Sequence, residues 1–390
     1  MVKKIVVVGG NAAGMMAAIA AAKFDPTADV TVITADRLAY RRPAIPDLIA
    51  GNIKSAEDAA IFSSDILSRY NIKLICPATA TNIDAAAKTI HFEFNGRKDS
   101  IAYDSAIIAT GGTPAIPNTP GADKKGVCTF TTFEAAKEII DIATNGGSAV
   151  VVGAGFIALE IAEALMHKGM DVYFNMRSRI LRRVLEPQMS DYLCRHFEQR
   201  GLKILSDEAI SEIGGEGRVE YVVHKGKKIA VSLVVMGTGV KPNVALTKKC
   251  GIVPGATGAI KVDHHMRTSV ADIYAAGDCA ESPDLDTGAF IYSPVASIGA
   301  MAGKIAGQNA AGGDVQTKGF LRAQGDKILG LQIFSVGHST ITAKEVNLPV
   351  TVRDLEMKLP EHQGGSYNRF EMAKLLTDSN ESIVGGQLIA

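Results

Sequence analysis

The same four-part pattern occurs twice in this 390-residue chain, about 140 residues apart. Each copy has a short apolar run, a glycine-rich turn, a stretch of helical length and a second apolar run. The first copy comprises residues 4–8, 9–14, a segment ending at Lys23, and 29–34; the second begins with "SAVVVGAGFIALEIAEAL" and ends with "GMDVYFN". Apolar runs without alternation are typical of strands buried on both faces of a parallel sheet. The pattern therefore predicts an α/β protein with two Rossmann-like dinucleotide-binding domains.

The first glycine turn has most of the features of a dinucleotide site. Gly9 permits a tight turn, and Gly14 lets the helix pack closely on the strand. The N–H groups at the start of that helix, around Ala12 and Ala13, are free to bind a pyrophosphate. The middle position of the fingerprint is Asn11 instead of glycine, and the only acid near the end of the following strand is Asp36. A glycine-rich turn without a ligand is the alternative for this copy alone.

The second glycine turn predicts a second dinucleotide, so the pair indicates a flavin and a nicotinamide. Its residues are Gly153 and Gly155, followed by Phe156, Ile157 and Ala158 at the start of the helix. An NAD site would place a carboxylate near the end of the next strand, where this chain has Asn175. Arg177 and Arg179 follow, and arginine suits the 2′-phosphate of NADPH through charge-assisted hydrogen bonds. The sequence favours NADPH over NADH, the alternative being a solvated arginine-rich loop.

Charge and cysteine content exclude several other classes of protein. Lys plus Arg and Asp plus Glu both number 41, so the net charge of zero gives no electrostatic reason to propose a nucleic-acid partner. The five cysteines are scattered, which predicts reduced thiols and no metal site. Gly9-Gly10 interrupts the N-terminal apolar run, which argues against a signal peptide, and no window is apolar enough for a membrane span. We therefore expect a cytoplasmic protein.

Three further motifs stand in order around the second glycine turn: "YDSAIIATGGTPAIPNTPG", "VVMGTGVKPN" and "TSVADIYAAGDCAE". With them the chain resembles the FAD-dependent pyridine nucleotide-disulfide oxidoreductase superfamily. It is most similar to the branch that holds NADH oxidases, coenzyme A disulfide reductases, and rubredoxin and ferredoxin reductases. The resemblance implies a discontinuous FAD-binding domain (1–113 and 244–316), an inserted NAD(P)-binding domain (114–243) and a short α+β dimerisation-like domain (317–390). In the last, residues 327–336, 369–376 and 382–390 look like strands.

The resemblance also assigns cofactor roles to single residues. For FAD it implies the first turn and the residues that follow it in the family motifs: Gly9, Asn11, Ala12, Ala13, Gly14, Asp36, Arg42, Pro43, Thr110, Gly111, Asp278 and Ala296. Ala296 lies in "SPVASIGAMAGKIAG", a helix whose N-terminus would point at the flavin ring. For NAD(P) it implies Gly153, Gly155, Phe156, Ile157, Asn175, Arg177, Arg179 and Gly239. Glu160 matches the family glutamate near flavin N5, with Arg41 or Arg42 as its partner.

The stretch "AYRRPAIP", residues 39–46, has no cysteine where the oxidase branch of the family carries one. It resembles instead the turn of the rubredoxin and ferredoxin reductases, in which Tyr40, Arg42 and Pro43 would wrap the FAD. Cys76 lies outside the matching motif and is expected to be a buried small residue, and Cys279 is expected to pack. Electrons would therefore pass from NAD(P)H to FAD and leave without a thiol relay.

The sequence leaves the acceptor open between a redox protein of the rubredoxin or ferredoxin kind and a small molecule such as oxygen or a quinone. Two alternatives are a flavin subunit of a larger metalloenzyme complex and a flavoprotein that senses nicotinamide without turnover. The family's C-terminal domain normally continues past the point where this chain stops, at Ala390. A homodimer and a hetero-complex are both open on this ground.

Overall fold

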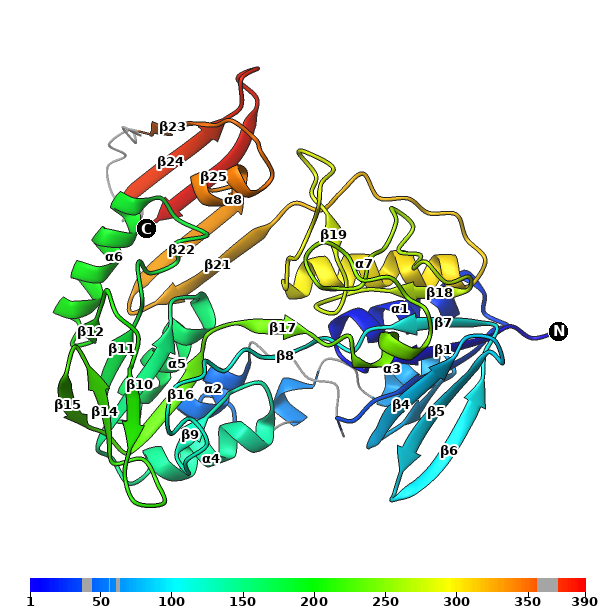
Figure 1. The fold of residues 1–390 in the computed structure, drawn as a ribbon. Helices are drawn as coiled ribbons and strands as arrows, with labels where there is room; N and C mark the ends of the chain where they lie inside the picture. Colours follow the sequence, from blue (N-terminus) through cyan, green and yellow to red (C-terminus); the bar gives the residue numbers. More distant parts are fainter. Residues whose placement is uncertain (37–43, 56, 61–63, 356–370) are drawn as a thin grey trace, which may run out of the picture. The chain divides into compact units, whose positions relative to one another are not determined.

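The computed structural model describes residues 1–36, 44–55, 57–60, 64–355 and 371–390 (Figure 1). The chain divides into two compact units, each built from separate stretches of sequence. The first unit contains residues 1–41, 55–113 and 240–321, and the second contains residues 42–54, 114–239 and 322–390. Both units are α/β, which confirms the fold class expected from the sequence. The division into FAD, NAD(P) and C-terminal domains stays a prediction.

The first unit is built on a parallel sheet in the order β18-β7-β1-β2-β3. The strands are β1 (Lys4–Val8), β2 (Asp29–Ile33), β3 (Ile72–Ile75), β7 (Ser105–Ile108) and β18 (Ile273–Ala275). β1 has the bounds expected from its apolar run, and four of its five residues are buried. An antiparallel sheet of β4 (Ala78–Asp84), β5 (Thr89–Phe94) and β6 (Arg97–Ala102) lies between β3 and β7 in the sequence. Short elements complete the unit: η2 (Glu57–Ala59), α3 (Ser64–Arg69), β8 (Gly112–Pro114), β17 (Val240–Pro242), η3 (Ala245–Lys249), β19 (Ser282–Pro283) and β20 (Phe290–Ile291).

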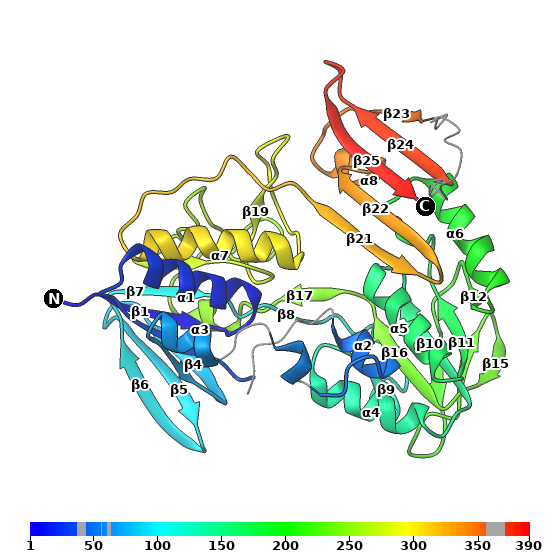
Figure 2. The same cartoon turned by 180° about the vertical axis from the view of Figure 1, so that it is seen from behind.

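Two helices lie side by side in this unit, α1 (Ala12–Phe24) and α7 (Ala296–Ala310), and both views show the contact (Figures 1 and 2). Glycine makes the approach possible. A Cβ atom on Gly303 would stand 2.1 Å from the carbonyl oxygen of Ala13, and one on Gly307 would stand 2.0 Å from that of Ala17. The backbones of the two helices therefore touch where a side chain would otherwise separate them.

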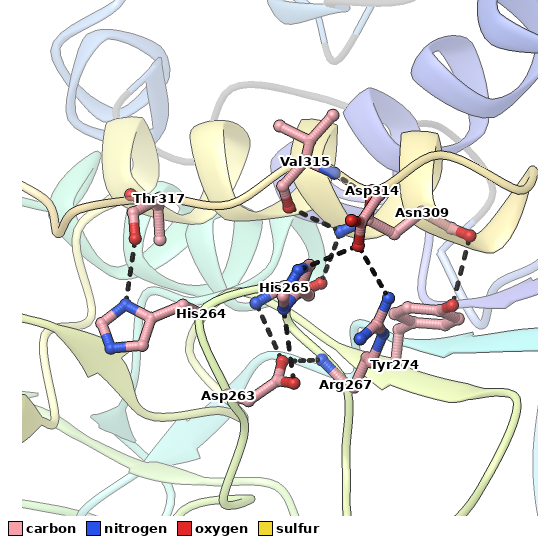
Figure 3. A network of polar contacts seen from close by, with 9 residues as sticks. All are labelled: Asp263, His264, His265, Arg267, Tyr274, Asn309, Asp314, Val315 and Thr317. Carbon is pink, nitrogen blue, oxygen red and sulfur yellow. Dashed lines mark hydrogen bonds and ion pairs between the residues drawn. The ribbon is translucent and has the colours of Figure 1, made fainter.

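A polar network holds the C-terminal end of α7 (Figure 3). Asn309 is 2% exposed; its Nδ2 donates to the carbonyl oxygens of His265 (2.9 Å) and Val315 (2.8 Å), and its Oδ1 accepts from the Val315 N–H (2.7 Å). The His265 ring lies between two carboxylates, 3.6 Å from Asp263 and 3.0 Å from Asp314. The network thus fixes the end of α7 and the segment after it to the 263–267 loop.

The second unit contains a second parallel sheet, in the order β12-β11-β10-β16-β9. Its strands are β9 (Val127–Cys128), β10 (Ser148–Gly153), β11 (Asp171–Asn175), β12 (Lys203–Leu205) and β16 (Leu233–Gly237). The same unit contains the helices α2 (Ile45–Ala50), α4 (Phe133–Ala143), α5 (Phe156–His167) and α6 (Pro187–Gln199), and α2 packs against α4 and α5. A small antiparallel sheet is formed by β13 (Glu212–Gly214), β14 (Tyr221–His224) and β15 (Lys227–Ala230).

The C-terminal part of the second unit is an antiparallel sheet in the order β21-β22-β25-β24-β23, with the short helix α8 (Thr340–Glu345). Its strands are β21 (Ala323–Ile328), β22 (Leu331–Gly337), β23 (Thr351–Asp354), β24 (Met372–Thr377) and β25 (Ile383–Ile389). The two last strands confirm the expected pair. The single strand expected over 327–336 is wrong, because Leu329 and Gly330 take positive φ angles of 47° and 90° and turn the chain into a hairpin.

No helix among the described residues is long and apolar enough to cross a bilayer.

The glycine contact between α1 and α7 gives a stability prediction. Gly303→Ala should lower the free energy of unfolding by about 1–3 kcal/mol, because the new methyl group forces two packed backbones apart. Gly386→Ala is the matched control, since the nearest heavy atom to a Cβ there is Leu375 Cδ2 at 3.6 Å. Urea denaturation of both variants measures the difference. Equal stability of the two would show that the helices separate without cost.

Candidate active site

The first glycine turn joins β1 to α1 by backbone contact. Gly9 has a φ of +111°, and a Cβ atom there would lie 2.1 Å from the carbonyl oxygen of Ala109. A Cβ on Gly14 would lie 1.9 Å from the carbonyl oxygen of Gly9. Both glycines of the expected fingerprint are therefore required by the space they occupy, and the start of α1 is brought against the ends of β1 and β7.

The N-terminus of α1 is left open for a ligand. Asn11 is its N-cap residue, but its side chain makes no capping hydrogen bond. Instead Asn11 Nδ2 donates to Asp36 Oδ2 at 3.2 Å. Asn11 therefore supplies no side-chain acceptor to the first N–H groups of the helix, at Ala12 and Ala13, and the helix dipole there favours an anionic group such as a pyrophosphate.

Thr110 and Gly111 lie where the chain leaves the first sheet. The Thr110 hydroxyl donates to the carbonyl oxygen of Asn243 at 2.7 Å, and the Asn243 N–H donates to Gly111 O at 2.9 Å. These two bonds fasten the outgoing segment to the returning segment. Thr110 also lies beside the first glycine turn, since its N is 3.3 Å from the place of a Cβ on Gly9. Contact of Thr110 and Gly111 with a cofactor stays a prediction.

Asp278 lies next to the start of α1. The preceding residue, Gly277, has a φ of +83°, and a Cβ on it would stand 2.8 Å from that of Ala13. A Cβ atom on Gly299 of α7 would in turn stand 3.2 Å from the Cα of Gly277. The loop with Asp278 is thus packed between the N-terminal turns of α1 and α7. Helix α7 begins at Ala296, three residues later than the start at Ser293 expected from the sequence, because Val295 is still extended.

Two buried hydroxyl groups just before α7 have no hydrogen-bond partner among the described residues: those of Tyr292 and Ser293. Burial raises the pKa of Tyr292, and the nearby Asp278 and Cys279 raise it further. A buried hydroxyl group without a hydrogen-bond partner lowers stability by about 1–3 kcal/mol. Two such groups on consecutive residues therefore indicate a site where a polar ligand could supply the partners. Sequence reasoning missed these residues, although they directly precede the expected helix.

These features of the first unit fit FAD: an open helix N-terminus, backbone that only glycine can form, and hydroxyl groups without partners. Tyr40, Arg41, Arg42 and Pro43, which were expected to wrap the cofactor, lie outside the described residues. Nothing in the structure therefore bears on the role expected for Arg42.

The second glycine turn repeats the construction in the second unit. Gly153 has a φ of +154°, and a Cβ on it would lie 2.2 Å from the carbonyl oxygen of Gly237 and 3.1 Å from Cβ of Ala158. Gly155 is the N-cap of α5 and has open space around it. The next residues follow in the first turn of the helix, with Phe156 half-buried and Ile157 40% exposed. The N-terminus of α5 is therefore also uncapped and accessible.

Asn175 ends β11 with its amide turned into the protein. It is 1% exposed, and Nδ2 donates to the carbonyl oxygens of Leu205 (3.0 Å) and Glu208 (2.8 Å). Only its Oδ1 lacks a partner among the described residues. Arg177 is exposed and Arg179 is half-buried. Arg177 and Arg179 therefore supply the positive charge after β11, and the Asn175 amide mainly holds the backbone at Leu205 and Glu208. Gly239, the remaining expected residue, is exposed with a φ of +93°.

Glu160 lies on α5 in acidic surroundings. Burial, a hydrogen bond with Asp326 and the charges of Asp326, Asp47 and Glu163 together raise the pKa of Glu160 to about 9. Glu163 is held next to it, because its Oε1 accepts from the Leu329 N–H at 3.0 Å. Glu160 is therefore a neutral carboxylic acid at pH 7, able to donate a hydrogen bond. The partner expected from the sequence, Arg41 or Arg42, lies outside the described residues and stays a prediction; the described groups that raise this pKa are carboxylates.

The stretch "AYRRPAIP" has no cysteine, and the cysteines found elsewhere in the chain are poor candidates for redox chemistry. Cys279 is fully buried, as expected, with Sγ 3.4 Å from the carbonyl oxygens of Ile108 and Ala276. Burial raises the pKa of Cys128 to about 12 and that of Cys194 to about 11, so both remain thiols. Cys76 was expected to be buried; this is wrong, because it is only half-buried.

The raised pKa of Glu160 gives a stability prediction with a defined sign. The folded protein holds this proton up to about pH 9, whereas an unfolded glutamate releases it near its ordinary pKa of 4.5. Stability is therefore lost as pH rises between these values. Glu160→Gln should be more stable than wild type at pH 9 by several kcal/mol, up to about 6 because the rise from 4.5 to about 9 is worth ~1.4 kcal/mol per unit, and should differ from it by less than about 1 kcal/mol at pH 5. Urea denaturation at both pH values, with exposed Glu381→Gln as control, checks this. A gain that is the same at both would contradict it.

Comparisons with known proteins agree with this geometry. The family model of the pyridine nucleotide-disulphide oxidoreductases matches residues 3–291. An NADH oxidase from Methanocaldococcus jannaschii is 32% identical over 392 residues, which covers 99% of this chain and 87% of the relative. The structure of an NAD-dependent persulfide reductase from A. fulgidus superposes with a TM-score of 0.94 at 32% identity, over 99% of this chain and 74% of the other.

A third similar structure is an engineered water-forming NADPH oxidase bound to NADPH, with a TM-score of 0.92 and 25% identity over 99% of this chain and 87% of the other. These matches confirm the resemblance seen in the sequence. The chain belongs to the pyridine nucleotide-disulphide oxidoreductase family and is an FAD-dependent oxidoreductase of NAD(P)H.

Proposed function

We propose that the protein oxidises NADPH in preference to NADH and passes the electrons from FAD directly to an acceptor, without a cysteine relay. The observation that carries the proposal is the position of the thiols. The first cysteine in the chain is Cys76, so the turn at residues 39–46 has none. Those at Cys128, Cys194 and Cys279 are buried or kept protonated by burial. Attack on a disulfide or persulfide requires a thiolate, which none of these three supplies.

FAD, when bound, supplies the chemistry: it accepts a hydride and can release electrons singly or as a pair. The chain's own groups bind and orient it. The N–H groups of α1 bind its pyrophosphate, and the hydroxyl groups of Tyr292 and Ser293 gain the partners they lack. The family resemblance gives Glu160 a place near flavin N5. A neutral carboxyl group there donates a hydrogen bond and puts no negative charge beside the reacting ring.

Coenzyme preference rests on the arginines after β11. A strand end without a carboxylate does not repel a 2′-phosphate, and Arg177 and Arg179 add charge-assisted hydrogen bonds. The engineered NADPH oxidase is described by replacements that remove an aspartate and introduce two arginines. That combination of changes supports the same assignment for this chain.

The acceptor is proposed to be a small molecule or a redox protein. The name of the Methanocaldococcus relative, NADH oxidase, supports the former. A specific observation favours a second candidate, the flavin subunit of a larger complex. The assimilatory nitrate reductase electron transfer subunit of Bacillus subtilis is 30% identical over 85% of this chain, which corresponds to 40% of that relative.

Thiol chemistry gives the first test of this proposal. Alkylation of accessible cysteines, and Cys76→Ser alone, should leave the rate of NAD(P)H-dependent dye reduction within about threefold of wild type, since no step uses a thiolate. Steady-state rates of the FAD-loaded protein measure the effect. A loss of more than about tenfold, equivalent to ~1.4 kcal/mol of barrier, would refute the mechanism without a relay.

Coenzyme choice gives the second test. Arg177→Ala should raise KM for NADPH by about tenfold and change that for NADH little, because one charge-assisted hydrogen bond is worth ~1.5–3 kcal/mol. Arg97→Ala, an exposed arginine on β6, serves as control. The measurement is kcat/KM for both coenzymes. If wild type already prefers NADH and Arg177→Ala keeps the same ratio, there is no 2′-phosphate site here.

A further inference from the structure

The arginine-rich loop at residues 176–186 is tied at its start to the nucleotide site. The Met176 N–H donates to the carbonyl oxygen of Leu205 at 3.0 Å. Leu181, with a φ of +50°, donates its N–H to the carbonyl oxygen of Ala154 at 2.7 Å. Because Ala154 lies between the two glycines of the second fingerprint, the loop and the glycine turn are held in one arrangement.

The second half of the loop is held by the C-terminal sheet and helix. The guanidinium of Arg183 forms a two-bond ion pair with the carboxylate of Glu345 on α8, with Nη2 to Oε2 at 2.8 Å. The hydroxyl of Ser339 donates to the carbonyl oxygen of Arg183, and that of Ser335 to Val184 O, both at 3.0 Å. Three residues of the C-terminal segment therefore bind two consecutive residues of the loop.

Glu186 closes the loop and is 5% exposed. Its carboxylate accepts from the Thr340 N–H (2.9 Å), the Thr340 hydroxyl (2.7 Å) and Gln387 Nε2 (3.3 Å). Its own N–H donates to Gln387 Oε1 at 2.7 Å. No cation is paired with it among the described residues, and these three accepted hydrogen bonds satisfy its carboxyl oxygens. Moving the loop would leave that carboxylate unsatisfied, which makes the position of the loop strongly determined.

The four arginines of the loop fall into two groups. Arg183 is occupied by Glu345. Arg177 and Arg182 are exposed and Arg179 is half-buried, and none of these three forms an ion pair within the described part of the chain. The backbone is thus fixed while three cations remain available. Pre-organisation of this kind reduces the entropy lost when a ligand binds.

We propose that the C-terminal segment is part of the coenzyme site: Glu345 and Thr340 are positioning residues that hold the loop so that Arg177, Arg179 and Arg182 meet the 2′-phosphate of NADPH. This inference rests on the proposed NADPH preference and adds to it. It assigns specificity to residues far along the chain from the nucleotide-binding fingerprint. It also names Arg182 as a third cation of the site.

The test measures binding of two nucleotides that differ only in the phosphate read by the loop. Isothermal titration of the FAD-loaded protein gives Kd for 2′,5′-ADP and for 5′-AMP. The variants are the double change Glu345→Gln with Thr340→Val, and Glu381→Gln as matched control. Glu381 forms an exposed ion pair with Arg353 on the same C-terminal sheet, away from the loop. The double variant should bind 2′,5′-ADP about 3–10-fold more weakly and 5′-AMP within about twofold of wild type.

Trypsin gives a second readout, because it cleaves after arginine. Faster cleavage within residues 177–183 of the double variant, and not of Glu381→Gln, is expected when the loop is released. If the double variant does not fold, Ser335→Ala removes a single hydrogen bond to the loop and is tested in the same way.

The outcomes separate this inference from the function on which it rests. Wild type that binds both nucleotides equally would refute the 2′-phosphate site and this inference with it. Wild type that prefers 2′,5′-ADP, with a double variant that keeps both the ratio and the trypsin pattern, would overturn the positioning role alone and leave the proposed function intact.

Discussion

The structure depends on backbone touching backbone at positions where a side chain would stand. In the first unit a carbonyl oxygen lies 1.9 Å from the place of a Cβ on Gly14, and in the second unit one lies 2.2 Å from that of Gly153. These contacts put the first turn of a helix directly behind the ends of parallel strands. The uncapped N–H groups of α1 and α5 follow from that placement. A nucleotide phosphate can then approach the free N–H groups at the positive end of the helix dipole.

The second unit adds two opposite electrostatic features to this frame. On α5, Glu160 lies among Asp47, Glu163 and Asp326, so burial and like charges keep its proton in place. The loop after β11 carries positive charge instead, because three of its arginines form no ion pair with a carboxylate in the described part of the chain. One region stabilises a neutral acid and the other attracts an anion. Such a division suits a site that must bind a charged coenzyme and yet keep a charge away from the reacting ring.

Local patterns predicted the regular elements well and the side-chain environments poorly. β1 has the expected bounds, and β2 and the helices after both glycine turns were expected within a few residues, because apolar runs and glycines act over short range. The β21–β22 hairpin is not predicted by the local pattern, since Gly330 lies inside an apolar run that is typical of one continuous strand. The carboxylates around Glu160 were not predicted, because Asp326 reaches it from a strand that no local pattern places there. The Glu186 network was invisible for the same reason: Thr340 and Gln387 join it only through the tertiary fold.

The discontinuity of the first unit has a consequence for how the protein is made. β7 pairs with β18 and α1 packs on α7, yet these partners are separated in the chain by the whole second parallel sheet. During synthesis the alanine-rich face of α1, with Ala13 and Ala17, has no partner until α7 leaves the ribosome. The strands from β9 to β16 are by then complete and need no later segment to form their sheet. The first unit is therefore begun before the second parallel sheet and completed after it, and its nascent N-terminal part must stay apart from other chains while the inserted sheet folds ahead of it.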